Sequence, residues 1–306
     1  MDSERNPSSS ARKEISTLKL RDKVAIVTGA GVGIGRTIAL KFAKEGAKLA
    51  INSRTRTTLE DTAKKIEDLG GEVLARTMDV SVPEEVEQFV QDTYKEFGRV
   101  DVLVNNAGIL GPIGPAAEND VASWIYTIHV NLIGTFLCCR KVLPIMIRQR
   151  RGKIINMSGG GATSPYPRFS AYATSKAGVV GLTQTLAEEV KDYNIQVNAI
   201  APGLTDTRMQ DEILAAGELA GERAIARARE AKEKGGADPA RAADLAVFLA
   251  SEESGVMTGR LISAVWDDWE SLADKNRLKD LITSELYTLR RIDGTFFAPV
   301  KKGIQK

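Results

Sequence analysis

The chain has 306 residues, of which 43% are hydrophobic and 27% are charged, a composition typical of a globular protein rather than a disordered or fibrous one. It carries 42 Lys and Arg against 40 Asp and Glu, so the net charge of +2 lacks the basic excess of a dedicated nucleic-acid-binding protein. A single histidine excludes sites built on several histidines. Cys138 and Cys139 are adjacent, which suits neither a mutual disulfide nor a metal clip. We therefore expect no metal site and no nucleic-acid partner.

Residues 1–21 are polar and rich in serine, and they lack both the apolar core of a secretory signal and the acidic-poor composition of a transit peptide. We interpret this segment as a flexible N-terminal arm. No apolar run approaches the roughly 20 residues that cross a bilayer, so no membrane partner is expected. The chain fits a reducing compartment, and we predict a cytoplasmic location.

From residue 22 onward, short apolar segments alternate with amphipathic ones. The pattern predicts strands at 23–28, 48–51, 72–78, 100–104, 153–157, 195–200 and 259–265. It predicts helices at 34–45, 58–69 and 83–97, and over most of 119–148 and 171–192. This alternation indicates an α/β fold, a doubly wound parallel seven-stranded sheet (Rossmann fold), in a single domain over 22–265.

Two segments lie outside the strand and helix alternation. Residues 204–236 follow the sixth strand, are rich in Ala, Glu and Arg, and are predicted to form a helical lid where doubly wound sheets bind ligands. Residues 266–306 form a C-terminal extension in which Leu278, Leu281, Ile282, Leu286 and Leu289 have helical spacing. This predicts an amphipathic helix, packed on its own subunit or covering a neighbouring subunit or part of a substrate mouth. Arg290 and Arg291 are interpreted as a solvated pair, with an anionic ligand as the alternative.

A glycine-rich turn, Thr28-Gly29-Ala30-Gly31-Val32-Gly33-Ile34-Gly35, joins the first predicted strand to the first helix. Glycines at such a turn allow unusual φ values and close approach of a phosphate to the backbone. The following helix start offers free N–H groups and the positive end of its dipole to an anion. The context predicts a dinucleotide site, and a tight turn without a ligand is the alternative.

These residues resemble the short-chain dehydrogenase/reductase family in its short, non-extended branch. Gly29, Gly33 and Gly35 have the family's TGxxxGxG spacing, and Tyr172 and Lys176 match its YxxxK motif. The resemblance extends over about residues 22–265 and includes, in order, the segments Met78-Asp79-Val80, Asn105-Asn106-Ala107-Gly108, Asn131 in HVNLIGTF, and Pro202-Gly203 with Thr207. It implies a nicotinamide cofactor held by Gly29, Gly33, Ile34, Gly35, Ser53, Arg54, Asp79, Val80, Asn105, Ala107, Gly108, Tyr172, Lys176, Pro202, Gly203 and Thr207.

Tyr172 and Lys176 stand four residues apart, so they share one face of a helix. A tyrosine with an ordinary pKa near 10 is a poor acid or base at neutral pH, and a nearby ammonium lowers that pKa. The resemblance implies that Tyr172 exchanges a proton with the substrate oxygen and that Lys176 holds the nicotinamide ribose. It also implies that Asn131 helps to seat a water in a proton relay.

The catalytic serine of the family is out of register in this chain. The family pattern has two serines after the Asn that ends the fifth strand, and the second is catalytic. Here the run is Asn156-Met157-Ser158-Gly159-Gly160-Gly161, which places Gly159 at that position. We take Ser158 as the catalytic candidate, with Thr163 or Ser164 as substitutes and with no polarising hydroxyl as a further alternative.

Charge at the end of the second strand bears on the choice of cofactor. Users of NAD in this family usually carry an Asp where this chain has Ser53, and Arg54 follows directly. An Asp would repel a 2′-phosphate, whereas an arginine suits one. The sequence therefore favours NADP(H) over NAD(H).

The expected function is hydride transfer between nicotinamide and a ketone or secondary alcohol, by an NADPH-dependent ketoreductase of 3-oxoacyl type. One alternative is a sugar or polyol dehydrogenase of the same family, and another is a catalytically silent dinucleotide-binding regulatory protein. The partners implied are a small-molecule carbonyl or alcohol substrate and further copies of the chain, in a homotetramer or homodimer.

Overall fold

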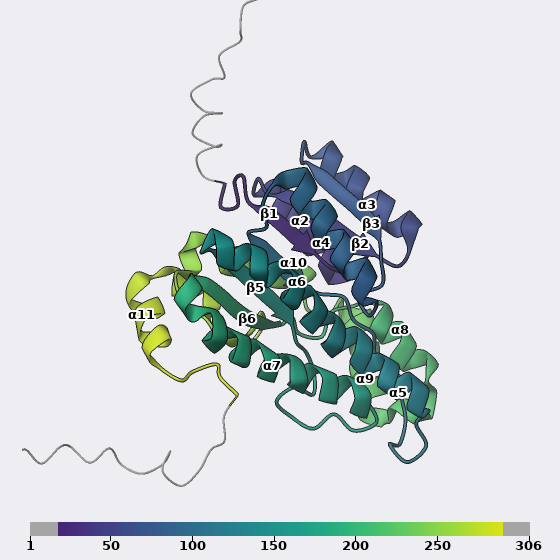
Figure 1. The fold of residues 1–306 in the computed structure, drawn as a ribbon. Helices are drawn as coiled ribbons and strands as arrows, with labels where there is room; N and C mark the ends of the chain where they lie inside the picture. The colour runs from purple at the N-terminus through teal and green to yellow at the C-terminus, as the bar shows by residue number, and fades with distance from the viewer. Residues whose placement is uncertain (1–17, 290–306) are drawn as a thin grey trace, which may run out of the picture.

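The computed structural model describes residues 18–289 and shows one parallel sheet with the strand order β3-β2-β1-β4-β5-β6-β7 (Figure 1). The predicted seven-stranded doubly wound sheet is confirmed. The strands are β1 (Val24–Val27), β2 (Lys48–Ser53), β3 (Val73–Thr77), β4 (Val102–Asn105), β5 (Gly152–Met157), β6 (Ile195–Ala201) and β7 (Leu261–Ser263). Their near-continuous apolar composition reflects burial on both faces.

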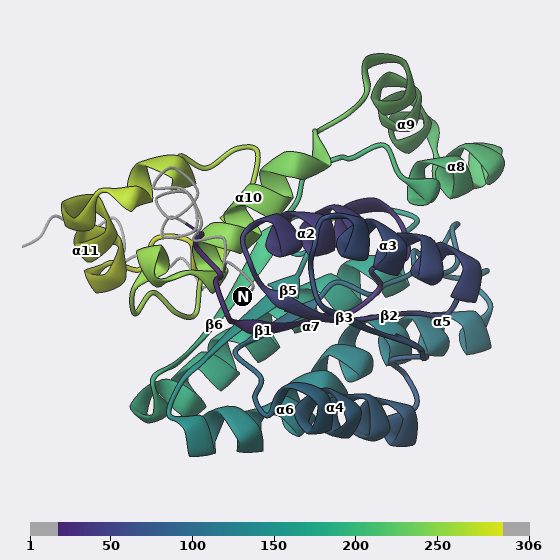
Figure 2. The same cartoon turned by 90° about the horizontal axis from the view of Figure 1, so that it is seen from above.

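Helices cover both faces of the sheet (Figure 2). One layer consists of α2 (Gly33–Lys44), α3 (Arg56–Asp68) and α10 (Pro239–Ala250), and the other contains α4 (Pro83–Phe97), α6 (Gly134–Gln149) and α7 (Ser170–Val190). Each layer has its own apolar core, with Phe42 fully buried in the first and Phe89 in the second. Pro83 begins α4, where a missing N–H costs nothing, and Gly98 ends it with a φ of 74°.

The helix predicted over most of 119–148 is interrupted in the structure. It consists of α5 (Val121–Ile128), a π-helical turn at His129–Ile133, and α6. Asn131 lies in the π turn, a feature that is frequent at functional sites. By length and composition the whole stretch Val121–Gln149 is apolar enough to cross a membrane, but 56% of its most apolar window is buried inside the protein. The packing of this stretch inside the protein therefore accounts for its apolar composition.

The predicted lid segment forms two helices, α8 (Arg208–Ala215) and α9 (Glu222–Lys234), which project as a pair from the α2 and α10 layer (Figure 2). Lys232 of α9 forms ion pairs with Asp206 of the entry loop at 2.8 Å and with Asp211 of α8 at 2.7 Å. The segment thus has internal structure of its own.

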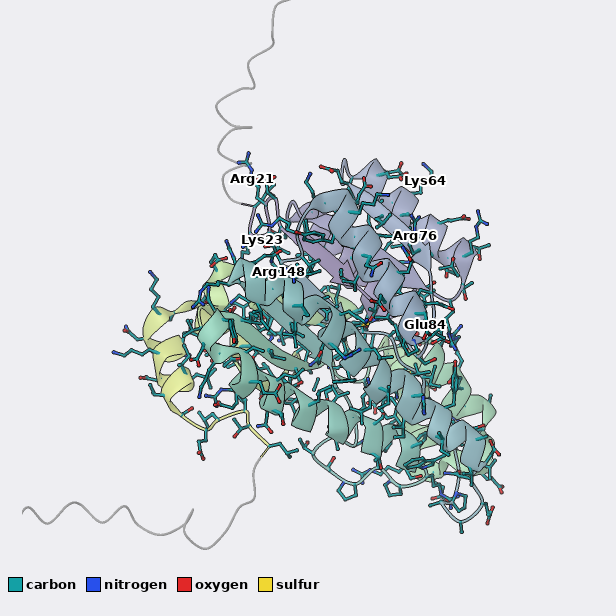
Figure 3. All side chains as sticks on the ribbon, in the orientation of Figure 1. Arg21, Lys23, Lys64, Arg76, Glu84 and Arg148 are labelled. Atoms are coloured by element: carbon teal, nitrogen blue, oxygen red, sulfur yellow. The ribbon has the colours of Figure 1, made fainter. Side chains whose placement is uncertain are left out.

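Both edge strands of the sheet are protected from pairing with another chain. On β3, Arg76 pairs with Asp92 of α4 at 3.1 Å, and Figure 3 shows Arg76 at this end of the molecule together with Lys64 of α3. On β7, the N–H of Leu261 donates to the carbonyl of Tyr287 at 2.7 Å. The C-terminal extension therefore covers the second edge.

The extension packs on its own subunit. The amphipathic helix expected there is α11 (Lys275–Thr283), with Leu278 and Leu281 in the core, whereas Leu286 beyond its end is 63% exposed. The predicted pair Arg290 and Arg291 lies outside the described residues. At the other end of the chain, Leu20 is fully buried, so the folded part begins inside the segment that we interpreted as an arm.

Candidate active site

The carboxyl ends of β1 and β4 form the switch point of the sheet, because the chain proceeds from β1 toward one edge and from β4 toward the other. Such a point opens a crevice in which doubly wound sheets bind ligands. The glycine-rich turn follows β1, and the Asn105-Asn106-Ala107-Gly108 turn follows β4. The topology therefore brings together two motifs that lie more than 70 residues apart.

Asn106 ties these two turns to each other. Its side-chain amide donates to the carbonyls of Thr28 at 3.0 Å and Gly29 at 3.2 Å. The Thr28 hydroxyl accepts in return from the backbone N–H groups of Asn106 at 3.0 Å and Ala107 at 3.1 Å. Asn106 is a positioning residue that our site assignment omitted, although the duplicated Asn of the motif was a visible signal.

The turn between β1 and α2 fits a dinucleotide. Gly29 and Gly33 have φ values of 67° and 58°, which glycine adopts readily. A Cβ on Gly29 would lie 2.8 Å from the Cα of Ala107, whereas one on Gly33 would meet only Thr207, at 3.6 Å. No side chain caps the N-terminus of α2, so the N–H groups around Ile34 and Gly35 are free to face a pyrophosphate.

The other predicted cofactor residues surround the same crevice. Ser53 ends β2 and Arg54 follows it, and Asp79 and Val80 follow β3. Pro202, Gly203 and Thr207 form the loop between β6 and α8. The Asn105 side chain is buried and donates to Asn156 at 2.9 Å and to the Cys139 sulfur at 3.3 Å. Its side-chain oxygen has no hydrogen-bond partner within the described residues, and its predicted cofactor contact stays a prediction.

Tyr172, Lys176 and Asn131 converge at the mouth of this crevice. Lys176 places its ammonium 5.6 Å from the centre of the Tyr172 ring and donates to the Met157 carbonyl at 2.8 Å. A Cβ on Gly108 would lie 3.2 Å from the Asn131 side-chain oxygen and 3.5 Å from the Lys176 nitrogen. The three predicted side chains and the β4 turn thus form one cluster.

The Asn131 side chain makes three hydrogen bonds within the protein. Its oxygen accepts from the N–H of Ile109 at 2.8 Å, and its amide donates to the Ile109 carbonyl and the Ser175 hydroxyl, both at 2.9 Å. This arrangement anchors the π turn to the loop after β4. The oxygen keeps a second lone pair, and the part of Asn131 in a proton relay stays a prediction.

Burial dominates the electrostatics of the Tyr172 and Lys176 pair. It raises the pKa of Tyr172 to about 12 and lowers the pKa of Lys176 to about 8. We expected the ammonium to lower the tyrosine pKa, and this expectation is wrong for the protein without its cofactor. Tyr172 is therefore a protonated acid at neutral pH.

Gly159 is the residue that lies beside the Tyr172 hydroxyl. A Cβ on Gly159 would lie 2.8 Å from the hydroxyl oxygen of Tyr172. The hydroxyl of Ser158 is buried and donates to the Lys176 carbonyl at 3.3 Å, while Thr163 and Ser164 are exposed. None of the three hydroxyls that we considered thus has a described contact with Tyr172.

An apolar and aromatic wall encloses the cluster on the lid side. The Tyr166 ring stacks on Phe169 with centroids 4.3 Å apart and meets the Tyr172 ring edge-on at 6.5 Å. Leu110, Phe169, and Ile213 of α8 share one hydrophobic cluster, against which Tyr172 packs. Phe169, Leu110 and Ile213 are themselves buried, so the part of this wall that is open to a substrate consists of the partly exposed residues packed on it, Tyr166 among them.

Comparison with known proteins agrees with this geometry. Residues 23–217 match the family model described as short chain dehydrogenase. The chain belongs to the short-chain dehydrogenase/reductase family. It is thus an oxidoreductase that acts on CH–OH or keto groups with a nicotinamide cofactor.

Characterised relatives cover most of the chain. It is 37% identical over 247 residues to the 3-oxoacyl-[acyl-carrier-protein] reductase FabG of Thermotoga maritima, spanning 80% of this chain and 97% of the relative. It is 35% identical over 248 residues to the (2S)-[(R)-hydroxy(phenyl)methyl]succinyl-CoA dehydrogenase subunit BbsD of Thauera aromatica, spanning 79% of this chain and 95% of the relative. Both alignments extend beyond the dinucleotide site.

Solved structures of the family share the fold. NAD+-bound xylitol dehydrogenase superposes with a TM-score of 0.75 at 29% identity, covering 80% of this chain and 98% of the other. Levodione reductase gives a TM-score of 0.74 at 33% identity, covering 82% of this chain and 98% of the other. The short-chain dehydrogenases similar to this chain therefore include proteins named for polyol and for ketone substrates.

Proposed function

We propose that this short-chain dehydrogenase is an NADPH-dependent ketoreductase of 3-oxoacyl type. The observation that carries the proposal is the pairing of the Tyr172 hydroxyl, a proton donor, with the Lys176 ammonium, which lies 5.6 Å from the centre of the Tyr172 ring. Reduction of a ketone needs such a donor at the carbonyl oxygen. The similarity to a 3-oxoacyl-[acyl-carrier-protein] reductase also supports a reaction in which a ketone is reduced.

In the proposed reaction the bound nicotinamide supplies the hydride to the carbonyl carbon. Tyr172 donates its proton to the carbonyl oxygen. Lys176 holds the nicotinamide ribose, and its ammonium stabilises the phenolate that Tyr172 becomes. The glycine turn and the α2 N-terminus bind the pyrophosphate, and Arg54 binds the ribose 2′-phosphate.

The wall beside Tyr172 favours a substrate with an apolar body. The partly exposed residues that pack against the buried cluster, Ile113, Met209 and the Tyr166 ring among them, are largely apolar and offer few hydrogen bonds to a chain of hydroxyl groups. A polyol would lose its contacts with water there without replacement, which is costly. The sugar or polyol alternative is therefore the weaker one, although a xylitol dehydrogenase has a similar structure.

A substrate panel tests the proposal. Purified protein is mixed with NADPH or NADH and with acyl-thioester ketones, simple cyclic ketones or sugars, and the nicotinamide absorbance is followed. We expect the fastest oxidation of NADPH with a 3-oxoacyl thioester. Turnover confined to polyols with NAD+ would overturn both the substrate and the cofactor assignment.

We also propose that the enzyme is a homodimer or homotetramer. Val121, Ile125, Ile133 and Phe136 recur at helical spacing along α5, the π turn and the start of α6, and their exposed fractions lie between 36% and 69%. An apolar stripe of this kind is typical of an association surface. Light scattering gives the mass in solution. The cytoplasmic location stays a prediction, which cell fractionation tests.

A further inference from the structure

A tyrosine that plays no part in the chemistry joins two of the predicted cofactor residues. Tyr126 lies on α5, distant in sequence from both β2 and β3. Its hydroxyl accepts a hydrogen bond from the Arg54 guanidinium at 3.0 Å and donates to the Asp79 carboxylate at 3.0 Å. The three side chains thus form a chain across the adenosine end of the crevice.

The hydroxyl is placed between the two opposite charges. Arg54 and Asp79 approach to 3.9 Å, which is too far for a direct hydrogen bond. Each side chain instead hydrogen-bonds to the Tyr126 hydroxyl that lies between them. Asp79 is held independently by Ser81, whose N–H and hydroxyl donate to its other oxygen at 2.9 Å and 2.7 Å. Only Arg54 therefore depends on Tyr126 for its direction.

The titration of Asp79 agrees with this picture. Burial by itself would raise the pKa of Asp79, but the hydrogen bonds from Ser81 and Tyr126 and the charge of Arg54 outweigh it and lower the pKa. The carboxylate is therefore charged at neutral pH and attracts Arg54. Without an intervening group, the attraction would draw the guanidinium into a direct pair.

We propose that Tyr126 is a positioning residue for cofactor selection, whose hydroxyl keeps the Arg54 guanidinium available to a ribose 2′-phosphate. The proposal rests on the proposed preference for NADPH. Tyr126 uses one of the five N–H donors of Arg54 and leaves the others for a phosphate. An arginine that is already held in place also loses less conformational entropy when a ligand binds.

Direct binding measurements test the proposal without turnover. The dissociation constants of NADPH and NADH are measured by fluorescence titration for the wild type and for Tyr126→Phe, which removes only the hydroxyl. Loss of one hydrogen bond to Arg54 should weaken NADPH about two- to tenfold. NADH should change less than about twofold, because Asp79 keeps its bonds from Ser81.

A matched variant controls for removal of a surface hydroxyl. Tyr94→Phe changes a tyrosine on α4 that is 44% exposed, and both dissociation constants should stay at their wild-type values. Equal weakening of the two cofactors by Tyr126→Phe would overturn the proposal. Tighter NADPH binding would overturn it as well, since it would mean that the Tyr126 hydroxyl keeps the Arg54 guanidinium away from the 2′-phosphate.

The Arg54→Ala background separates this proposal from the one on which it rests. Arg54→Ala should weaken NADPH about ten- to hundredfold and leave NADH little changed. In that background, Tyr126→Phe should have no further effect on NADPH, because it acts through Arg54. If Arg54→Ala leaves NADPH binding unchanged, the proposed cofactor preference fails. If Arg54→Ala weakens it while Tyr126→Phe acts additively, only the role of Tyr126 fails.

Discussion

A Cβ on Gly159 would lie 2.8 Å from the hydroxyl oxygen of Tyr172. The Tyr172 hydroxyl therefore lies where a side chain at this position would project, and only a glycine fits there without a shift of the ring. In the family pattern a serine hydroxyl occupies this position. This enzyme has no side chain there, so the residue at this position cannot polarise the carbonyl through a hydroxyl.

The first prediction concerns the close approach of Gly159 to Tyr172. Gly159→Ala places a methyl group within 2.8 Å of the Tyr172 hydroxyl, so the ring must shift. We expect kcat to fall about 10- to 100-fold, as for other small displacements of reacting groups, with the NADPH dissociation constant unchanged. Gly160→Ala is the matched control, because a Cβ there lies 3.7 Å from the Tyr166 ring, an ordinary contact. Equal activity of the two variants would contradict the assignment.

The second prediction compares the two hydroxyls of the catalytic assignment. Tyr172→Phe removes the proton donor and should lower turnover at least about a hundredfold while NADPH still binds. Ser158→Ala removes a hydroxyl that donates to the Lys176 carbonyl, and turnover should stay within about twofold of the wild type. Steady-state rates of the two variants are measured with a ketone that the wild-type enzyme has been shown to reduce. A large loss in Ser158→Ala would restore Ser158 as the polarising residue.

The third prediction is the pH profile of reduction. Tyr172, with a pKa of about 12, stays protonated throughout the neutral and mildly alkaline range. Lys176 loses its proton as the pH rises through about 8, and its stabilisation of the phenolate is lost with it. We expect kcat/KM for ketone reduction to be level below about pH 8 and to fall above it.

Two controls accompany the profile. Lys176→Arg should move the fall upward if it retains activity, because the guanidinium stays charged. The titration of Lys176 does not itself destabilise the fold, because between about pH 8 and its ordinary pKa of 10.5 the unfolded chain holds a proton that folded Lys176 has lost, and this group then makes folding more favourable as the pH rises. A rate that is level to about pH 10 would show that the ammonium is not needed.

The fourth prediction concerns the C-terminal extension. The guanidinium of Arg260 is 8% exposed and donates to four backbone carbonyls of the extension, those of Leu281, Ile282, Ser284 and Leu286, at 2.7 to 3.2 Å. Arg260→Met leaves these acceptors unpaired, and the free energy of unfolding should fall by about 3 kcal/mol.

Urea denaturation measures this loss against a matched exposed arginine. Arg277 pairs with Asp268 at 3.1 Å, both largely exposed, so Arg277→Met should cost less than about 1 kcal/mol. If the two variants lose the same stability, Arg260 does not anchor the extension.

The sequence by itself determined the fold class and predicted the main site residues. The strand and helix alternation predicted the sheet because strands buried on both faces must be apolar throughout, a pattern that is visible residue by residue. The glycine turn and the Tyr172 and Lys176 pair were recognisable because their members lie within one turn or one helix face. Their chemistry depends on short-range spacing, which a sequence displays directly.

Only the tertiary structure decided which residues face each other across elements. That Gly159 rather than Ser158 borders Tyr172, and that Tyr126 joins Arg54 to Asp79, follows from how α5 and α7 pack on the sheet. The pKa of Tyr172 was predicted in the wrong direction because sequence spacing shows the nearby Lys176 but not the desolvation of both groups. Burial and contacts between distant segments are properties of the packed chain, and no local pattern encodes them.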